Sequence, residues 1–213
     1  MDHPLEWLTP ILGYLLGAVP FAFLIGRLAG VDLRKVGSGN PGAGNLTRVV
    51  GVKAGAVAAL LDGFKGLIPM LVLKSWDFGP AVISLTGLAI VIGHNWSIFM
   101  GGRSGRGLAP SSGVLLGVAP ALIVWPGGWS VAGWKFGGGL AGFIAWSSLP
   151  VLTVLFDYPA ASVLACFGLA VLCVGRRMQG NLGRIPGFRA AVHRAIFDTD
   201  GLEMPEAEET ART

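Results

Sequence analysis

Long apolar runs constrain this chain more than any other feature of its sequence. Five of them approach the roughly 20 residues that a helix needs to cross the hydrocarbon core of a bilayer. They lie at residues 8–26, 52–73, 79–100, 137–157 and 159–175. Only 13% of the side chains are charged, against about 25% in an ordinary soluble domain, so a water-soluble fold could not cover its surface. The sequence predicts an all-α integral membrane protein.

The apolar stretch between residues 108 and 134 differs from these five runs. It is interrupted by Pro120, Pro126 and the pair Gly127-Gly128, which disfavour one continuous helix. We expect two short helices that enter the membrane and return as a hairpin. Together with the five runs, they bring the expected number of transmembrane helices to about seven.

Charge sets the expected orientation. Of the 16 lysines and arginines, all except Lys65 and Lys74 fall in connections on one side of the membrane when the runs are threaded alternately. Cytoplasmic loops carry such an excess, so we expect the N-terminus outside and the C-terminus in the cytoplasm. Apolar periodicity is lost near Pro186, and the last residues are acidic. The chain is expected to divide into a membrane-embedded domain, residues 1–185, and a mobile cytoplasmic tail, residues 186–213.

The first connection on the basic side, residues 36–48, is dense in glycine and short polar side chains. Arg34, Lys35 and Arg48 lie in or beside it. Such a loop can turn several backbone N–H groups toward an anion, so we interpret it as a phosphate-binding loop; the alternative is a flexible connector. The loop also matches G-x-G-x-x-G formally. Because it contains Pro41 and follows a membrane span, a dinucleotide site is rejected.

Two charged residues lie inside an expected span. Asp62 and Lys65 are three residues apart and share one helix face. At that depth they must be paired and must face protein or a watery cavity. They form either a structural ion pair or, through Lys65, the floor of a polar site.

A histidine and a second basic loop follow the third apolar run. His94 precedes the glycine-rich loop 101–107, which contains Arg103 and Arg106. A histidine near a helix end is more often a packing residue, but beside a phosphate site an imidazole can accept a hydroxyl proton. A third basic cluster, residues 176–184, follows the last run, and its alternative role is ordinary anchoring at the membrane surface. The three clusters suit a reaction between a phosphorylated water-soluble substrate and a phosphorylated amphiphile.

In order and spacing, these motifs resemble the bacterial acyl-phosphate glycerol-3-phosphate acyltransferases. The resemblance is carried by residues 13–21, 34–40 and 61–66 and by Gly93-His94. It implies transfer of a fatty acyl group from acyl phosphate to the 1-hydroxyl of glycerol 3-phosphate, giving lysophosphatidic acid and phosphate. It also implies a multi-pass enzyme of phospholipid synthesis in the bacterial inner membrane, with a cytoplasm-facing site. The implied partners are the two substrates and the bilayer, with no metal, cofactor or nucleic acid; the oligomeric state stays open.

The expected site residues follow from the same motifs. Those with a catalytic role are His94, Ser38 and Arg106. Those that bind substrate or phosphate are Gly37, Gly39, Asn40, Asn45, Arg48, Lys65, Arg103, Gly107, Asn181 and Arg184. Either His94 or a substrate phosphate is expected to accept the hydroxyl proton. Ser38 is expected to donate a hydrogen bond to phosphate, because no His or Asp is placed locally to activate it as a nucleophile.

Three features depart from the family pattern. Gly44 stands where the family usually has threonine, and the two arginines of the second loop stand where it usually has lysines. The His-Arg pair that normally precedes the asparagine at position 181 is absent. A His193-Arg194 pair occurs farther on, in the expected tail, where Arg194 should contribute little. Three alternatives stay open: a catalytically weak member of the family, a catalytically silent membrane scaffold or, from the buried charges, a small transporter for a phosphorylated metabolite.

Overall fold

The computed structural model of the chain describes residues 6–136, 138–180 and 187–197, and these form helices and their connections. In chain order the elements are η1 (Glu6–Leu8), α1 (Thr9–Ala18), α2 (Phe21–Leu28), α3 (Ala43–Val49), α4 (Val52–Ser75), α5 (Pro80–Asn95), η2 (Ile98–Met100), α6 (Leu108–Val118), η3 (Pro120–Ile123), α7 (Val124–Phe136), α8 (Gly138–Leu155), α9 (Ala160–Gln179) and α10 (Phe188–Phe197).

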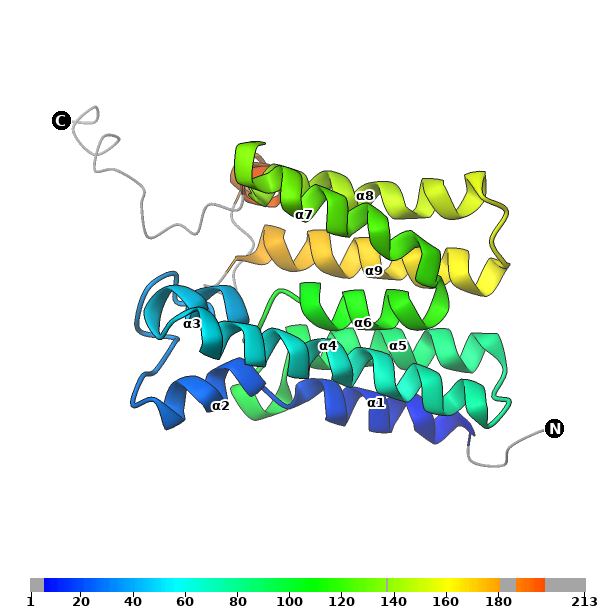
Figure 1. Ribbon diagram of the computed structural model, residues 1–213, viewed down its shortest axis with the longest axis horizontal. Helices are drawn as coiled ribbons and strands as arrows, with labels where there is room; N and C mark the ends of the chain where they lie inside the picture. The colour runs from blue at the N-terminus through cyan, green and yellow to red at the C-terminus, as the bar shows by residue number, and fades with distance from the viewer. Residues whose placement is uncertain (1–5, 137, 181–186, 198–213) are drawn as a thin grey trace.

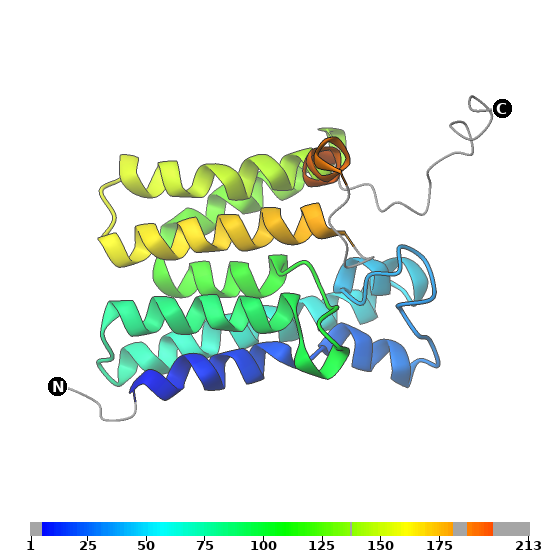
Figure 2. The same ribbon diagram turned by 180° about the vertical axis from the view of Figure 1, so that it is seen from behind.

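The long helices lie side by side in one bundle (Figures 1 and 2). Five stretches are long and apolar enough to cross a membrane: Glu6–Leu28, Val52–Ser75, Pro80–Met100, Gly138–Leu155 and Ala160–Gln179. They coincide with the five predicted spans, which are confirmed as helices. The start of α1 and the turns α4–α5 and α8–α9 lie at one end of the bundle, and α2 and α3 lie at the other (Figure 1).

The first span is broken in its middle, although the sequence analysis treated residues 8–26 as one helix. Helix α1 ends at Ala18 and α2 begins at Phe21. Pro20 lies between them, and because it has no N–H it cannot continue the hydrogen-bond ladder. The break leaves two carbonyls for side chains of other segments. Ser97 Oγ donates to the carbonyl of Ala18 at 2.5 Å, and a lysine described below takes the next one.

Helices α1 and α5 approach each other closely through glycine. A Cβ on Gly17 would collide with the carbonyl of Ile90, and one on Gly93 would collide with the carbonyl of Tyr14. Small residues of this kind let membrane helices come together. Farther along, the Tyr14 hydroxyl donates to the carbonyl of Trp96 at 3.0 Å. The end of α5 is thereby held beside the break between α1 and α2.

Two short helices, α6 and α7, occupy the predicted hairpin and are joined by η3. They run in opposite directions, as expected (Figure 1). Each packs mainly on a long helix rather than on the other: α6 lies against α4, and α7 lies against α8. The hairpin is therefore spread open, and a cavity lies between its two arms.

The predicted mobile tail contains a packed helix. Residues 188–197 form α10, which lies against α8 and α9. Ala191 and Ala195, four residues apart, are 1% and 3% exposed and allow this close packing. The packed body thus continues past the predicted boundary at residue 186. The charged residues Arg189, His193 and Arg194 dilute the apolar pattern and hid this helix from the sequence analysis.

Candidate active site

The predicted motifs gather at one end of the bundle, which we call the basic end. It comprises the first loop (residues 29–42), the second loop (residues 96–107) and the last turn of α9. In Figure 1 it is the end that carries α2 and α3, opposite the start of α1. Segments far apart in the sequence therefore contribute to one region.

Asp62, Lys65 and His94 form a buried charge cluster, which adjoins the second loop at Gly105. Lys65 Nζ is 2.7 Å from Asp62 Oδ1, and the two side chains are each 2% exposed. The same ammonium is 3.0 Å from His94 Nδ1 and donates to the carbonyl of Val19 at 2.9 Å. His94 Nδ1 is also 3.5 Å from Asp62 Oδ1. The predicted ion pair is present, and the helix break at Pro20 supplies its extra acceptor.

The contacts of Nδ1 favour one arrangement of hydrogen on the His94 ring, because the Lys65 ammonium at 3.0 Å is nearer than Asp62 Oδ1 at 3.5 Å. A charged lysine only donates, so the contact with Lys65 requires a lone pair on Nδ1. The neutral ring then carries its hydrogen on Nε2. That nitrogen faces Gly105 of the second loop so closely that a Cβ there would collide with it. His94 is arranged to donate a hydrogen bond through Nε2.

Arg176 ties the second loop to the end of α9. Its Nε donates to the carbonyl of Asn95 at 3.2 Å, and its Nη2 donates to that of Ser104 at 2.9 Å. Its Nη1 donates to the carbonyl of Gly180 at 2.6 Å. From the sequence, Arg176 was expected only as part of a basic cluster, because these backbone partners come from segments distant in the chain. The residue shapes the site by joining α5, the second loop and α9.

The second loop presents its two predicted arginines differently. Arg103 is exposed, whereas Arg106 is half-buried. Gly107 has a φ of 77° and adjoins Asn95, so a side chain at this position would be strained and would collide with that amide. Asn95 is fully buried, and its Oδ1 accepts no hydrogen bond in the described part of the chain. Gly107 allows the loop to turn into α6.

The first loop is held in shape by Asn45. Its Oδ1 accepts from the backbone N–H of Ser38 at 3.0 Å, and its Nδ2 donates to the carbonyls of Leu33 and Val36, both at 3.0 Å. Gly37, with a φ of 58°, lies against the same amide. Both Nδ2 hydrogens are thus used within the loop. Asn45 acts as the brace of the loop, which differs from the predicted role of phosphate ligand.

Other predicted residues of the first loop are open to a ligand. Asn40 is buried, and among the described residues its Oδ1 has no hydrogen-bond partner. Ser38 and Gly39 are half-buried, and Arg48, on α3, is exposed. Arg48 takes part in no ion pair within the described residues. The Asn40 oxygen can accept a hydrogen bond from a ligand hydroxyl, and the Arg48 guanidinium remains available for phosphate.

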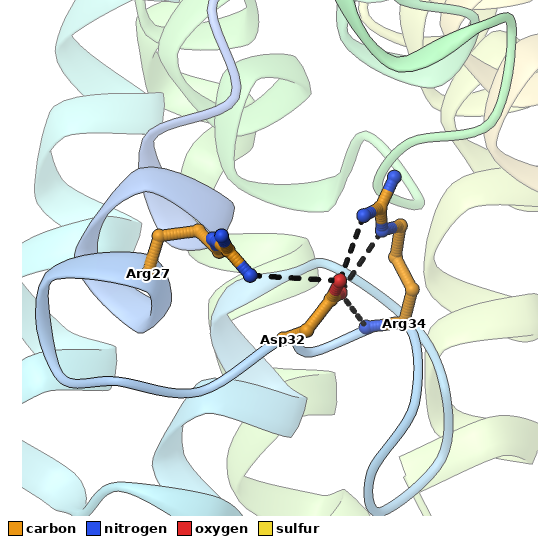
Figure 3. A network of polar contacts seen from close by, with 3 residues as sticks. All are labelled: Arg27, Asp32 and Arg34. Carbon is orange, nitrogen blue, oxygen red and sulfur yellow. Dashed lines mark hydrogen bonds and ion pairs between the residues drawn. The ribbon is translucent and has the colours of Figure 1, made fainter.

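Arg34, one of the three cations counted beside this loop, is already paired (Figure 3). Its Nη2 lies 2.7 Å from Asp32 Oδ2, and its Nε donates to Oδ1 at 2.9 Å. Arg27 adds a longer contact of 3.8 Å, and the guanidinium of Arg34 stacks on Phe23. The hydrogen bonds from Arg34 hold the pKa of Asp32 well below its usual range. Asp32 therefore neutralises this cation locally.

A cavity of about 570 Å³ begins where the second loop ends. Its walls are mostly small residues of α6, α7 and α8, including Ala109, Ser112, Gly133, Ala141 and Gly142. Arg177 lines it as well, and its Nη1 donates to the carbonyl of Gly139 at 2.6 Å. The guanidinium lies against Gly142, where a Cβ would collide with it. An apolar chamber with one cation at its wall suits an amphiphilic molecule.

Two predicted site residues, Asn181 and Arg184, lie outside the described residues. Of the others, Lys65 and His94 are in direct contact, and the remainder are distributed over the two loops and α3. Within residues 6–136, 138–180 and 187–197, no group of three or more His, Cys, Asp or Glu side chains could hold a metal ion.

Comparison with known proteins identifies relatives over most of the chain. Residues 7–186 match a protein family described as glycerol-3-phosphate acyltransferase. The protein of that name from Aquifex aeolicus is 37% identical over 181 residues, which cover 82% of this chain and 92% of the relative. A Thermotoga petrophila relative of the same name is 42% identical over 123 residues, 57% of this chain and 60% of its own length.

Two solved structures that resemble this chain are of proteins with the same described activity as these relatives. A crystal structure of PlsY (YgiH), described as an integral membrane glycerol 3-phosphate acyltransferase in its glycerol 3-phosphate form, has 36% sequence identity and a TM-score of 0.76. The similarity covers 82% of this chain and 88% of that one. A second structure of PlsY, in a lysophosphatidic acid form, is 34% identical with a TM-score of 0.75 and the same coverage.

Proposed function

The chain belongs to the glycerol-3-phosphate acyltransferase family, and we propose that it acylates glycerol 3-phosphate with acyl phosphate as the donor. The 1-hydroxyl oxygen attacks the acyl carbon, the bond from that carbon to the phosphate oxygen breaks, and lysophosphatidic acid and phosphate are released. The description of one PlsY structure as a lysophosphatidic acid form supports this product.

The observation that carries this proposal is the continuity of a basic loop with an apolar cavity. Leu108 and Ala109 line the cavity and directly follow the loop that contains Arg103 and Arg106. Acyl phosphate has a phosphate head next to a long apolar chain. The loop can hold the head while the cavity takes the chain, and the protein then acts mainly by positioning.

The proton of the attacking hydroxyl has an acceptor in the substrates themselves. His94 has its Nδ1 lone pair occupied by Lys65 and presents a hydrogen on Nε2, so it is arranged as a donor rather than a base. The departing phosphate can take the proton instead. In this mechanism Arg106, Arg103 and Arg48 hold phosphate, Ser38 donates to it through its hydroxyl, and the backbone N–H of Gly37 adds a donor.

The orientation proposed for the enzyme places the basic end in the cytoplasm of a bacterial inner membrane. The lysines and arginines of the described residues, except Lys65 and Lys74, belong to the loops and helix ends at this end. The positive-inside rule favours that orientation. Cysteines introduced beside Ser38 and Arg103 are expected to react with an impermeant reagent from the cytoplasmic side only; reaction of both from outside would invert the orientation.

The decisive experiment supplies purified protein with glycerol 3-phosphate and either acyl phosphate or acyl coenzyme A, followed by analysis of the lipid product. We expect lysophosphatidic acid with acyl phosphate alone. Robust turnover with acyl coenzyme A alone would refute the donor assignment. Uptake of glycerol 3-phosphate by proteoliposomes without acylation would instead indicate a transporter.

A further inference from the structure

Helix α10 brings an arginine to the end of α9. The helix packs on α8 and α9 through Ala191 and Ala195. It begins at residue 188, beyond residues 7–186 that match the family, so its role must be read from this chain itself. Arg194 precedes one of these alanines and lies over Gly180, the residue that ends α9.

The contact between Arg194 and Gly180 is close and specific. A Cβ on Gly180 would lie 2.8 Å from Nη1 of Arg194 and 3.3 Å from its Cζ. The glycine has a φ of 61°, in the left-handed region, and its carbonyl accepts a hydrogen bond from Arg176. The guanidinium groups of Arg176 and Arg194 thus both lie against Gly180. Arg194 itself makes no hydrogen bond or ion pair among the described residues, and its side chain is half-buried.

No carboxylate among the described residues is paired with Arg194. Asp62 is paired with Lys65, and Asp32 is paired with Arg34. The remaining described acidic residues lie at the opposite end of the bundle: Glu6, Asp77 and Asp157. Arg176 also donates to the carbonyl of Ser104 in the second loop. Arg194 is therefore connected to that loop through Gly180 and Arg176. A half-buried arginine without a carboxylate partner, such as Arg194, is favoured by a bound anion, because opposite charges attract.

We propose that Arg194 is a phosphate-binding residue of the candidate active site, supplied by α10 to the end of α9. The planar guanidinium can contact a phosphate group through two N–H donors. This inference rests on the proposed function for the choice of substrates, whose common chemistry is the phosphate group. It reverses the expectation that Arg194 lies in a tail and contributes little.

A purely structural role of Arg194 would affect different measurements than a role in ligand binding. A cation at the C-terminal end of a helix stabilises the exposed carbonyls there, which raises stability without affecting any ligand. Phosphate binding must also change the affinity for phosphate compounds. The two roles are separated by measuring ligand affinity and thermal stability on the same variants.

The test compares Arg194→Ala, Arg194→Lys and the matched control Arg189→Ala, which removes the same charge from an exposed position of the same helix. Affinity is measured from the shift of the unfolding midpoint in detergent with inorganic phosphate and with glycerol 3-phosphate. Initial rates then give KM for glycerol 3-phosphate and for acyl phosphate.

We expect Arg194→Ala to weaken binding of at least one phosphate compound by about 10- to 100-fold, as for loss of a hydrogen bond to a charged group. Arg194→Lys should be weakened less, and Arg189→Ala should match the wild type. A selective rise in KM for one substrate identifies whose phosphate is held. If Arg194→Ala unfolds, weakened binding by Arg194→Lys still supports the proposal, and unchanged binding by it overturns the proposal.

Unchanged affinity for every ligand in Arg194→Ala, with only a lower unfolding midpoint, would also overturn it. The binding measurement is independent of turnover. Wild-type protein that binds phosphate in an Arg194-dependent way but forms no lipid product would refute the proposed function and leave the role of Arg194 standing.

Discussion

The buried charge cluster and the surface pair of Asp32 and Arg34 use similar chemistry in opposite surroundings. Asp62 and Lys65 are 2% exposed, whereas Arg34 is 50% exposed and its partner Asp32 is 12% exposed. Each pair has an oxygen to nitrogen distance of 2.7 Å. The two pairs therefore cannot be distinguished by distance. They differ in whether water or a salt ion can replace a side chain that is removed.

Around Asp32, water and salt ions can take the place of a lost arginine, so exposed pairs contribute little. Around Lys65 there is no such substitute, and an unpaired buried charge is strongly unfavourable. The buried cluster consequently fixes the relative positions of α1, α4 and α5. The surface pair mainly removes one cation from the first loop.

Breaking the buried pair should have the largest effect. Lys65→Met leaves Asp62 without its cation and should lower the unfolding free energy by about 3 to 5 kcal/mol. Denaturant titration in detergent micelles measures this. The double variant Asp62→Asn, Lys65→Met should recover part of the loss, since no charge is then left unpaired. A single variant as stable as the double one would show that the ion pair is not what holds the cluster.

Removing a half-buried cation from the second loop should affect activity. Arg106→Ala should cost about 2 to 5 kcal/mol in kcat/KM, by analogy with truncating one partner of a buried charged hydrogen bond. Arg106→Lys should retain more activity because it keeps the charge. The exposed Arg48 provides the comparison, and Arg48→Ala should cost less. Steady-state rates with both substrates varied measure the two losses of kcat/KM. A smaller loss for Arg106→Ala than for Arg48→Ala would contradict the prediction.

Replacing His94 should have a smaller effect than loss of a general base. In His94→Asn the side-chain oxygen can still accept from Lys65, while the Nε2 donor is lost. We expect a loss of about 1 to 2 kcal/mol in kcat/KM, the value of one hydrogen bond. A general base is worth about 10²- to 10⁴-fold. A loss in the upper part of that range, with disappearance of the acidic limb of the pH profile, would identify His94 as the base.

The surface pair should show the smallest effect. Asp32→Asn should change the unfolding midpoint slightly at neutral pH, and raising the salt to about 1 M should reduce the difference, because the screening length of about 3 Å is then close to the length of the contact. The pKa of Asp32 is lowered in the folded state, so its contribution is present above its unfolded pKa and is lost as the pH falls through the folded value. The variant and wild type should converge in acid. A difference that salt leaves unchanged would mean that Asp32 has another role.

The membrane spans could be predicted because length and apolarity alone determine which segments cross a bilayer. The break at Pro20 could have been inferred from proline chemistry, yet the apolar run around it was treated as continuous. Helix α10 was missed because its packing depends on two alanines among charged residues. Their spacing of four, Ala191 to Ala195, and the same spacing of Phe188, Val192 and Ile196 were the local signs.

The sequence allowed the residue types of the site to be predicted. It did not allow prediction of which residues they pair with through hydrogen bonds and ion pairs. The sequence pointed to Lys65 and His94 but not to their contact, because 29 residues separate them along the chain. It counted Arg34 among the cations beside the first loop, although Asp32, two positions away, takes up that charge. Asn45 was expected at the ligand, and its bonds to loop carbonyls depend on a backbone path that residue types do not reveal.

The placement of Asp62 and Lys65 on one helix also bears on how the protein enters the membrane during synthesis. An ionised side chain at the centre of an inserting helix costs about 2.5 to 3.5 kcal/mol on the translocon scale. Helix α4 is synthesised before α5, so His94 is not yet present to help. Because the two charges are three residues apart, α4 carries its own counter-ion and can partition into lipid before the later spans emerge from the ribosome.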